Sequence, residues 1–162
     1  MANAPARKRS DSASRVIKAP RSTLYQAFID PVAVASWRPP EGMTARISAF
    51  EPRKGGVFRM AFTYTSTRHA VRGKTSEHSD VVEGRFLELI PDERIVERVE
   101  FESGDPAFAG AMTITTTLAE VAGGTEVTIL CEDVPSGIKP ADHQRGLAST
   151  LRNLAAFAEA RA

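Results

Sequence analysis

The sequence has only one cysteine, Cys131, so no disulfide can form within the chain. It has no apolar run approaching the roughly 20 residues that a membrane-spanning helix needs. The start, MANAPARKRSDSASR, lacks the apolar stretch that follows the basic residues of a secretory signal. We therefore expect a soluble cytoplasmic protein, kept in a reducing compartment, that does not insert into a membrane.

The sequence also lacks a strong net charge. Its 21 Lys and Arg residues nearly balance its 20 Asp and Glu residues, and four of the basic residues lie within the first 15 positions. Because clustered basic charge is the electrostatic signature of nucleic-acid binding, we expect no nucleic-acid partner. The Ala, Ser, Pro and Arg composition of residues 1–13 predicts a disordered basic leader, and residues 14–162 have the length of a single domain.

The usual sequence signatures of catalysis and of cofactor binding are missing. We find no His-Glu-x-x-His, Cys-x-x-Cys, Gly-x-Ser-x-Gly, Walker or Gly-x-Gly-x-x-Gly pattern. The three histidines, His69, His78 and His143, lie in a polar loop, near a strand start and at a helix start. We therefore predict no metal site and no cofactor, and we interpret Cys131 as a small core residue because it alternates with apolar neighbours.

The sequence does contain a clear order of periodic segments. Proline and helical spacing predict two short helices, over residues 20–30 and 30–37, after a first strand at residues 14–18. Period-two alternation then predicts six more strands, and the spacing of leucines predicts a long amphipathic helix over residues 140–161. This order indicates an α+β helix-grip fold, in which seven antiparallel strands wrap around the long C-terminal helix. The later strands are expected over residues 44–52, 57–65, 77–90, 94–101, 112–120 and 125–132.

Five segments carry a family resemblance over residues 14–160. They are IKAPRSTLYQAFIDPVAVASWRPPEG, FEPRKGGVFRMAFTY, GRFLELIPDERIVERVEF, GGTEVTI and the final helix. Together they resemble the START-related SRPBCC superfamily, specifically its AHSA branch of domains similar to the activator of heat-shock protein 90 ATPase. The resemblance implies a hydrophobic cavity for a small or lipid-like molecule, in a group that includes binding proteins, polyketide cyclases and co-chaperones. Only residues 1–13 precede the matching region, too few for that activator's separate amino-terminal domain, which disfavours a chaperone role.

A cavity of this kind would lie between the sheet and the C-terminal helix. Alternating apolar residues and polar-tipped aromatics supply its expected lining, although the same residues would also make a filled core. The expected ligand-binding residues are Trp37, Phe58, Met60, Phe62, Tyr64, Phe108, Met112, Ile114, Thr116, Gln144, Leu147 and Leu151.

Catalysis has weaker candidates. His78, Glu83 and Glu97 are potential proton-transfer groups, and Arg85 is a potential oxyanion partner, for a cyclase acting on an enolisable carbonyl. The alternative is that these side chains form cross-strand ion pairs on the surface of the sheet. We favour a domain that binds a hydrophobic small molecule, with an aromatase or cyclase and a co-chaperone or stress-response interaction module as alternatives. A homodimer and a chaperone partner stay open.

Overall fold

The computed structural model describes residues 9–40, 42–65 and 79–162. Its seven strands form one antiparallel sheet in the order β1-β7-β6-β5-β4-β3-β2. In chain order the elements are β1 (Arg9–Ile17), α1 (Arg21–Ile29), α2 (Pro31–Trp37), β2 (Met43–Phe50), β3 (Val57–Tyr64), β4 (Ser79–Ile90), β5 (Arg94–Phe101), a 3-10 turn η1 (Pro106–Phe108), β6 (Met112–Val121), β7 (Gly124–Val134) and α3 (Pro140–Glu159).

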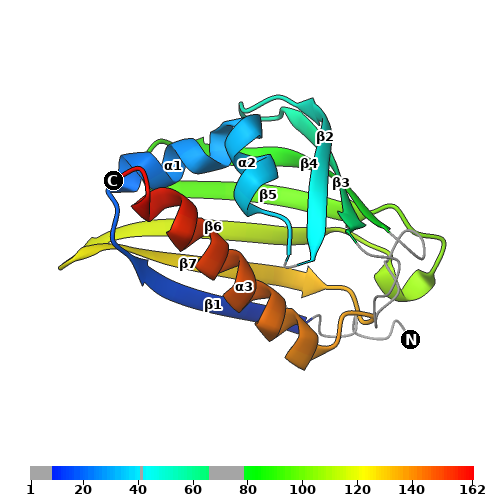
Figure 1. The fold of residues 1–162 in the computed structure, drawn as a ribbon. Helices are drawn as coiled ribbons and strands as arrows, with labels where there is room; N and C mark the ends of the chain where they lie inside the picture. The colour runs from blue at the N-terminus through cyan, green and yellow to red at the C-terminus, as the bar shows by residue number, and fades with distance from the viewer. Residues whose placement is uncertain (1–8, 41, 66–78) are drawn as a thin grey trace, which may run out of the picture.

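The sheet curves around the C-terminal helix. Figure 1 shows α3 crossing β6, β7 and β1, while α1 and α2 lie over the other half of the same face. This arrangement confirms the predicted helix-grip fold. None of the described helices is long and apolar enough to cross a membrane.

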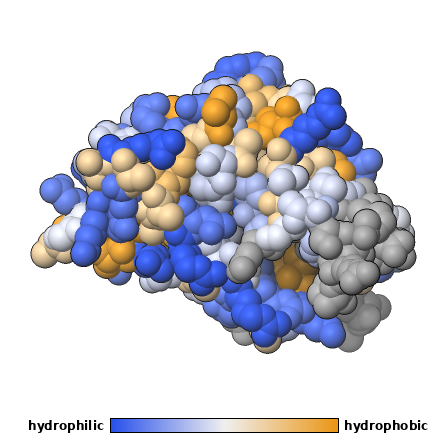
Figure 2. Space-filling model, in the orientation of Figure 1, coloured by the Kyte–Doolittle hydropathy of each residue, from blue (hydrophilic) through white to orange (hydrophobic). Residues whose placement is uncertain are grey.

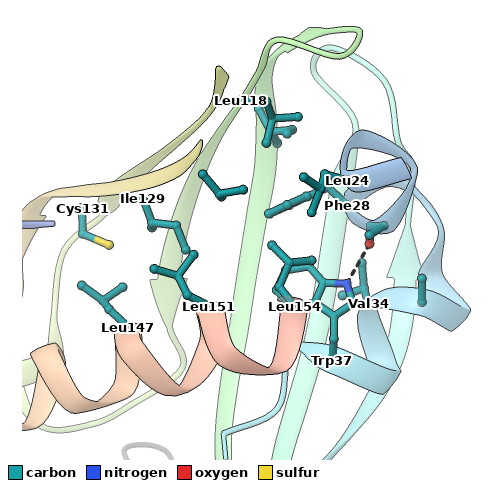
Figure 3. Close-up of a cluster of buried hydrophobic side chains, with 14 of the residues drawn as sticks. Leu24, Phe28, Val34, Trp37, Leu118, Ile129, Cys131, Leu147, Leu151 and Leu154 are labelled. Atoms are coloured by element: carbon teal, nitrogen blue, oxygen red, sulfur yellow. Dashed lines mark hydrogen bonds between the residues drawn. The ribbon is translucent and has the colours of Figure 1, made fainter. Parts of the chain in front are cut away.

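Local sequence signals explain the two short helices. Asp30 caps α2, because its carboxylate accepts a hydrogen bond of 2.9 Å from the backbone N–H of Val32, and Pro31 occupies the first turn. Trp37 then ties the end of α2 back to α1 by donating its indole N–H to the carbonyl of Ala27 at 2.9 Å (Figure 3). Its ring meets Phe28 edge-on, with 4.8 Å between the ring centroids. The sharp bend between the helices is therefore fixed by a cap and by a buried tryptophan.

The core lies between α3 and the concave face of the sheet. Leu147, Leu151, Leu154 and Ala158 share one stripe of α3, and all four are buried. Figure 3 shows the three leucines directed at side chains of the sheet and of α1 and α2. The stripe predicted from the sequence is therefore the face that α3 packs against the sheet.

The first strand differs from the prediction. It begins at Arg9, so residues 9–13, which the sequence assigned to a disordered leader, belong to the sheet. They carry little apolar alternation, but their backbone pairs with β7 from Arg9 opposite Val134 onward. Backbone pairing, which is independent of side-chain hydropathy, orders this polar segment. The expected leader otherwise falls on residues 1–8, which lie outside the described part of the chain.

Candidate ligand-binding cavity

A cavity of about 280 Å³ lies between the concave face of the sheet, the end of α2 and the first half of α3. Figure 2 shows a hollow in this face of the molecule with hydrophobic atoms at its base. Eight of the twelve expected ligand-binding residues line it: Trp37, Phe58, Met60, Phe62, Met112, Ile114, Thr116 and Leu147.

Three residues of β3 build the apolar wall. Phe58, Met60 and Phe62 alternate along the strand, so all three point to the concave face, where each is at most 9% exposed. The cross-strand neighbour of Phe58 is Gly84 on β4. A Cβ atom at Gly84 would lie 2.4 Å from Cζ of Phe58, so only glycine lets this ring approach β4 so closely.

A buried ion pair forms one polar end of the cavity. Glu97 on β5 accepts hydrogen bonds of 2.9 Å on both carboxylate oxygens from the two terminal nitrogens of Arg38, which follows α2. The side chains are 1% and 15% exposed, and the Arg38 guanidinium also lies 5.9 Å from the Trp37 ring centroid. Since both Glu97 oxygens are engaged by a cation, the pair neutralises itself and Glu97 is not a free proton acceptor.

A second polar pair lies at the β1 side. Nδ1 of His143, on the first turn of α3, lies 2.6 Å from Oδ2 of Asp11 on β1. Nε of Arg9 donates to the same oxygen at 3.1 Å. The His143 and Asp11 side chains are 13% and 9% exposed, and His143 lines the cavity.

One row of the sheet connects these two ends. Asp11 pairs with Cys131, Cys131 with Ile114, and Ile114 with Glu97, so the four residues follow one another across β1, β7, β6 and β5. Three strand spacings separate the outer two, which is roughly 14 Å between backbones. Burial raises the pKa of the Cys131 thiol to about 12; Arg38 opposes the shift, while Asp11 and Glu97 add to it. The middle of the row is therefore an apolar floor with an unreactive thiol.

The catalytic candidates do not assemble in the cavity. Glu83 lies on the outer face of the sheet, where its carboxylate is 3.5 Å from Nε of Arg59. Arg85 also points outward and donates to the carbonyl of Gly55 at 3.0 Å. The catalytic roles considered for Glu83 and Arg85 require both side chains to point into the cavity, and the structure shows that they do not. Gly84 lies on the inward face of β4, so its two neighbours in the regular pleat lie on the outward face. His78 lies outside the described residues.

Four of the expected ligand-binding residues lie elsewhere. Tyr64 ends β3 beyond the lining, and Leu151 is buried in the core cluster under α3. Gln144 is directed at β1, where its amide donates to the carbonyl of Ser12 at 3.3 Å. Phe108 lies against the loop before α3, since a Cβ atom on Gly137 would approach its ring to 2.8 Å. Phe108 is therefore placed as packing for that loop rather than as a lid over the cavity.

Sequence reasoning missed several polar residues of the lining, Arg38 and His143 among them. Arg38 was overlooked because it follows the helix end, and His143 because it was interpreted as a helix-start residue. A signal for His143 was present: it precedes Leu147 and Leu151 at intervals of four, which places all three on one stripe of α3. Asp11 had no such signal, because it lies in the part of β1 that carries little hydrophobic alternation.

Comparison with known proteins places this fold in a family. A family model described as activator of Hsp90 ATPase homolog 1-like protein matches residues 18–159. A solved structure from Chromobacterium violaceum is 33% identical with a TM-score of 0.80, covering 93% of this chain and 98% of that one. No curated protein matches the chain significantly.

Two further solved structures share the fold at lower identity. A protein from Rhodobacter sphaeroides is 19% identical with a TM-score of 0.77, covering 98% of this chain and 97% of its own. An AHSA1-like protein from Aeromonas hydrophila is 19% identical with a TM-score of 0.71, and 94% of each chain is covered. The fold and the family match agree with a general role in binding a ligand or in interaction. The chain belongs to the family of activator of Hsp90 ATPase homolog 1-like proteins.

Proposed function

We propose that this protein binds a small, mainly apolar molecule in the cavity between the sheet and α3. The observation that carries the proposal is a space of about 280 Å³ whose walls are largely aliphatic and aromatic. A well-packed core leaves few voids larger than a water molecule, so an opening of this size between buried apolar side chains is typical of a binding site.

The volume limits the size of the ligand. A cavity of about 150 Å³ holds benzene, which has six non-hydrogen atoms. By proportion, the 280 Å³ here suits a molecule of about 11 non-hydrogen atoms, such as a two-ring aromatic. A lipid with a long chain would require the cavity to expand.

The observations favour this role over the alternatives. For a cyclase, the described candidates offer Glu83 and Arg85 outside the cavity and Glu97 held in an ion pair. For an interaction module, we expect a sizeable exposed apolar patch, but the exposed large apolar residues among those described are Val16, Val32 and Leu87, on three different elements.

A cavity-filling variant tests the proposal. Met112 is 5% exposed and lines the cavity, so Met112→Trp should occupy the space that the ligand needs. We expect naphthalene, followed by its fluorescence, to bind the unmodified protein and to bind Met112→Trp about tenfold more weakly or less. Val32→Trp is the matched control, because position 32 is 79% exposed and carries the added indole away from the cavity. Equal binding by a folded Met112→Trp protein would contradict the proposal.

A further inference from the structure

We propose that the His143–Asp11 pair is the polar recognition point of the cavity, and that it selects an apolar ligand carrying a hydroxyl group, such as a phenol or an enol. This inference rests on the proposed function and adds to it the chemical class of the ligand. It assigns binding to a histidine that the sequence analysis interpreted only as a helix-start residue.

The short contact fixes which ring nitrogen carries the proton. An ionised carboxylate only accepts hydrogen bonds, so with Nδ1 of His143 2.6 Å from Oδ2 of Asp11, the proton lies on Nδ1. Arg9 donates to the same oxygen at 3.1 Å, so this oxygen faces two donors. In the neutral imidazole the other nitrogen, Nε2, is then an acceptor with a fixed orientation.

The surroundings leave Nε2 for a ligand. His143 lines the cavity, its side chain is 13% exposed, and the hydrogen bond that it forms to Asp11 uses Nδ1 and not Nε2. An imidazole nitrogen that accepts can receive a hydrogen bond from a ligand that brings a donor. Leu147, one turn along α3, lines the same cavity, so the body of a ligand bound at Nε2 would lie against apolar surface.

The two polar ends of the cavity therefore differ in what they offer. At the Arg38 end, the cation and the carboxylate of Glu97 satisfy each other through two hydrogen bonds of 2.9 Å. At the His143 end, Asp11 engages Nδ1, which leaves Nε2 as the acceptor of the imidazole. An apolar molecule with a single hydroxyl group fits this asymmetry, with its hydroxyl donating to Nε2 and its rings over the floor made by Ile114 and Cys131.

The test compares two probes of nearly equal shape. 2-Naphthol has a hydroxyl proton, whereas 2-fluoronaphthalene does not, and both have about 11 non-hydrogen atoms, as the cavity volume requires. Affinities are measured by calorimetry at about pH 8. We expect His143→Phe to lower the ratio of 2-naphthol affinity to 2-fluoronaphthalene affinity by about fivefold or more, because the hydroxyl loses its partner. Gln144→Ala, the neighbouring position directed at β1, is the matched control and should leave the ratio unchanged.

The outcomes separate this inference from the proposed function. If both probes bind and the ratio is the same in His143→Phe, the hydroxyl recognition is wrong while the cavity proposal stands. If neither probe binds the unmodified protein, both proposals fail. Should His143→Phe not fold, the unmodified complex still decides, because the ¹⁵N chemical shift of Nε2 changes when this nitrogen accepts a hydrogen bond. A larger shift with bound 2-naphthol than with bound 2-fluoronaphthalene supports Nε2 as the acceptor, and equal shifts contradict it.

Discussion

The buried pair of Arg38 and Glu97 gives a stability prediction whose size follows from the structure. Glu97→Leu removes both 2.9 Å contacts and leaves the Arg38 guanidinium, 15% exposed, without its counter-charge. Removing one partner of a buried ion pair costs about 3–5 kcal/mol. The partial exposure of Arg38 favours the lower limit, about 3 kcal/mol. For a chain of 162 residues this corresponds to a fall in Tm of about 6–12 °C.

The assay is urea unfolding, followed by circular dichroism, of four proteins: the unmodified chain, Glu97→Leu, Arg38→Met and the double variant. Replacing both partners by apolar residues leaves no buried charge, so we expect the double variant to recover most of the stability that Glu97→Leu loses. The coupling energy from this cycle should be about 2 kcal/mol or more. A Glu97→Leu protein within 1 kcal/mol of the unmodified chain, or a double variant no more stable than Glu97→Leu, would refute the reasoning.

Four other predictions follow from single positions. Gly84→Ala should destabilise the fold by about 1–3 kcal/mol in thermal or urea unfolding, because the added Cβ would lie 2.4 Å from Phe58. Gly104→Ala is the control and should be nearly neutral, because no atom lies within 4 Å of its Cβ. Gly146→Ala, at an uncrowded position inside α3, should stabilise the protein by about 0.5–1 kcal/mol in the same assay, and a loss of stability would contradict the open space beside it. Arg85→Ala should change the unfolding free energy by about 0.5 kcal/mol or less, because its side chain lies on the outer face; a loss of several kcal/mol would show that this surface placement is wrong. Burial raises the pKa of Cys131 in the folded protein to about 12, so the thiol of the unfolded chain ionises first as the pH rises, and the folded state loses stability. Between pH 8 and pH 10 this ionisation should lower the free energy of unfolding by about 1.4 kcal/mol, a loss that Cys131→Ala should not show. Parallel profiles of unfolding free energy against pH for the two proteins would count against the burial of the thiol.

Most elements of the fold could be predicted because they carry a local periodic signal. Phe58, Met60 and Phe62 alternate along β3, and Leu147, Leu151 and Leu154 recur with helical spacing along α3. Asp30 followed by Pro31 marks the boundary between the two short helices. These signals depend on residues within a few positions of one another, so no tertiary information is needed to read them.

The polar parts of the cavity could not be predicted in the same way. Arg38 meets Glu97 across 59 positions, and His143 meets Asp11 across 132, so each pair forms only when distant segments of the chain have folded together. Alternation correctly placed Glu97 on the inward face, buried at 1% exposure, but could not show which cation satisfies it. For Glu83 and Arg85, alternation along the strand does not determine which face of the sheet they occupy, because a shift of one residue in the strand register exchanges the two faces.

The most direct test of the central claim uses the methionines of the chain. Of its four methionines, Met60 and Met112 line the cavity, while Met43, on β2, does not. In protein labelled with ¹³C at the methionine methyl groups, NMR spectra recorded during a naphthalene titration report on each position separately. Binding in the cavity predicts that the aromatic ring currents shift the Met60 and Met112 signals together, with one dissociation constant, while the Met43 signal stays in place. Unchanged Met60 and Met112 signals at saturating naphthalene, or an equal shift of Met43, would contradict a ligand site between the sheet and α3.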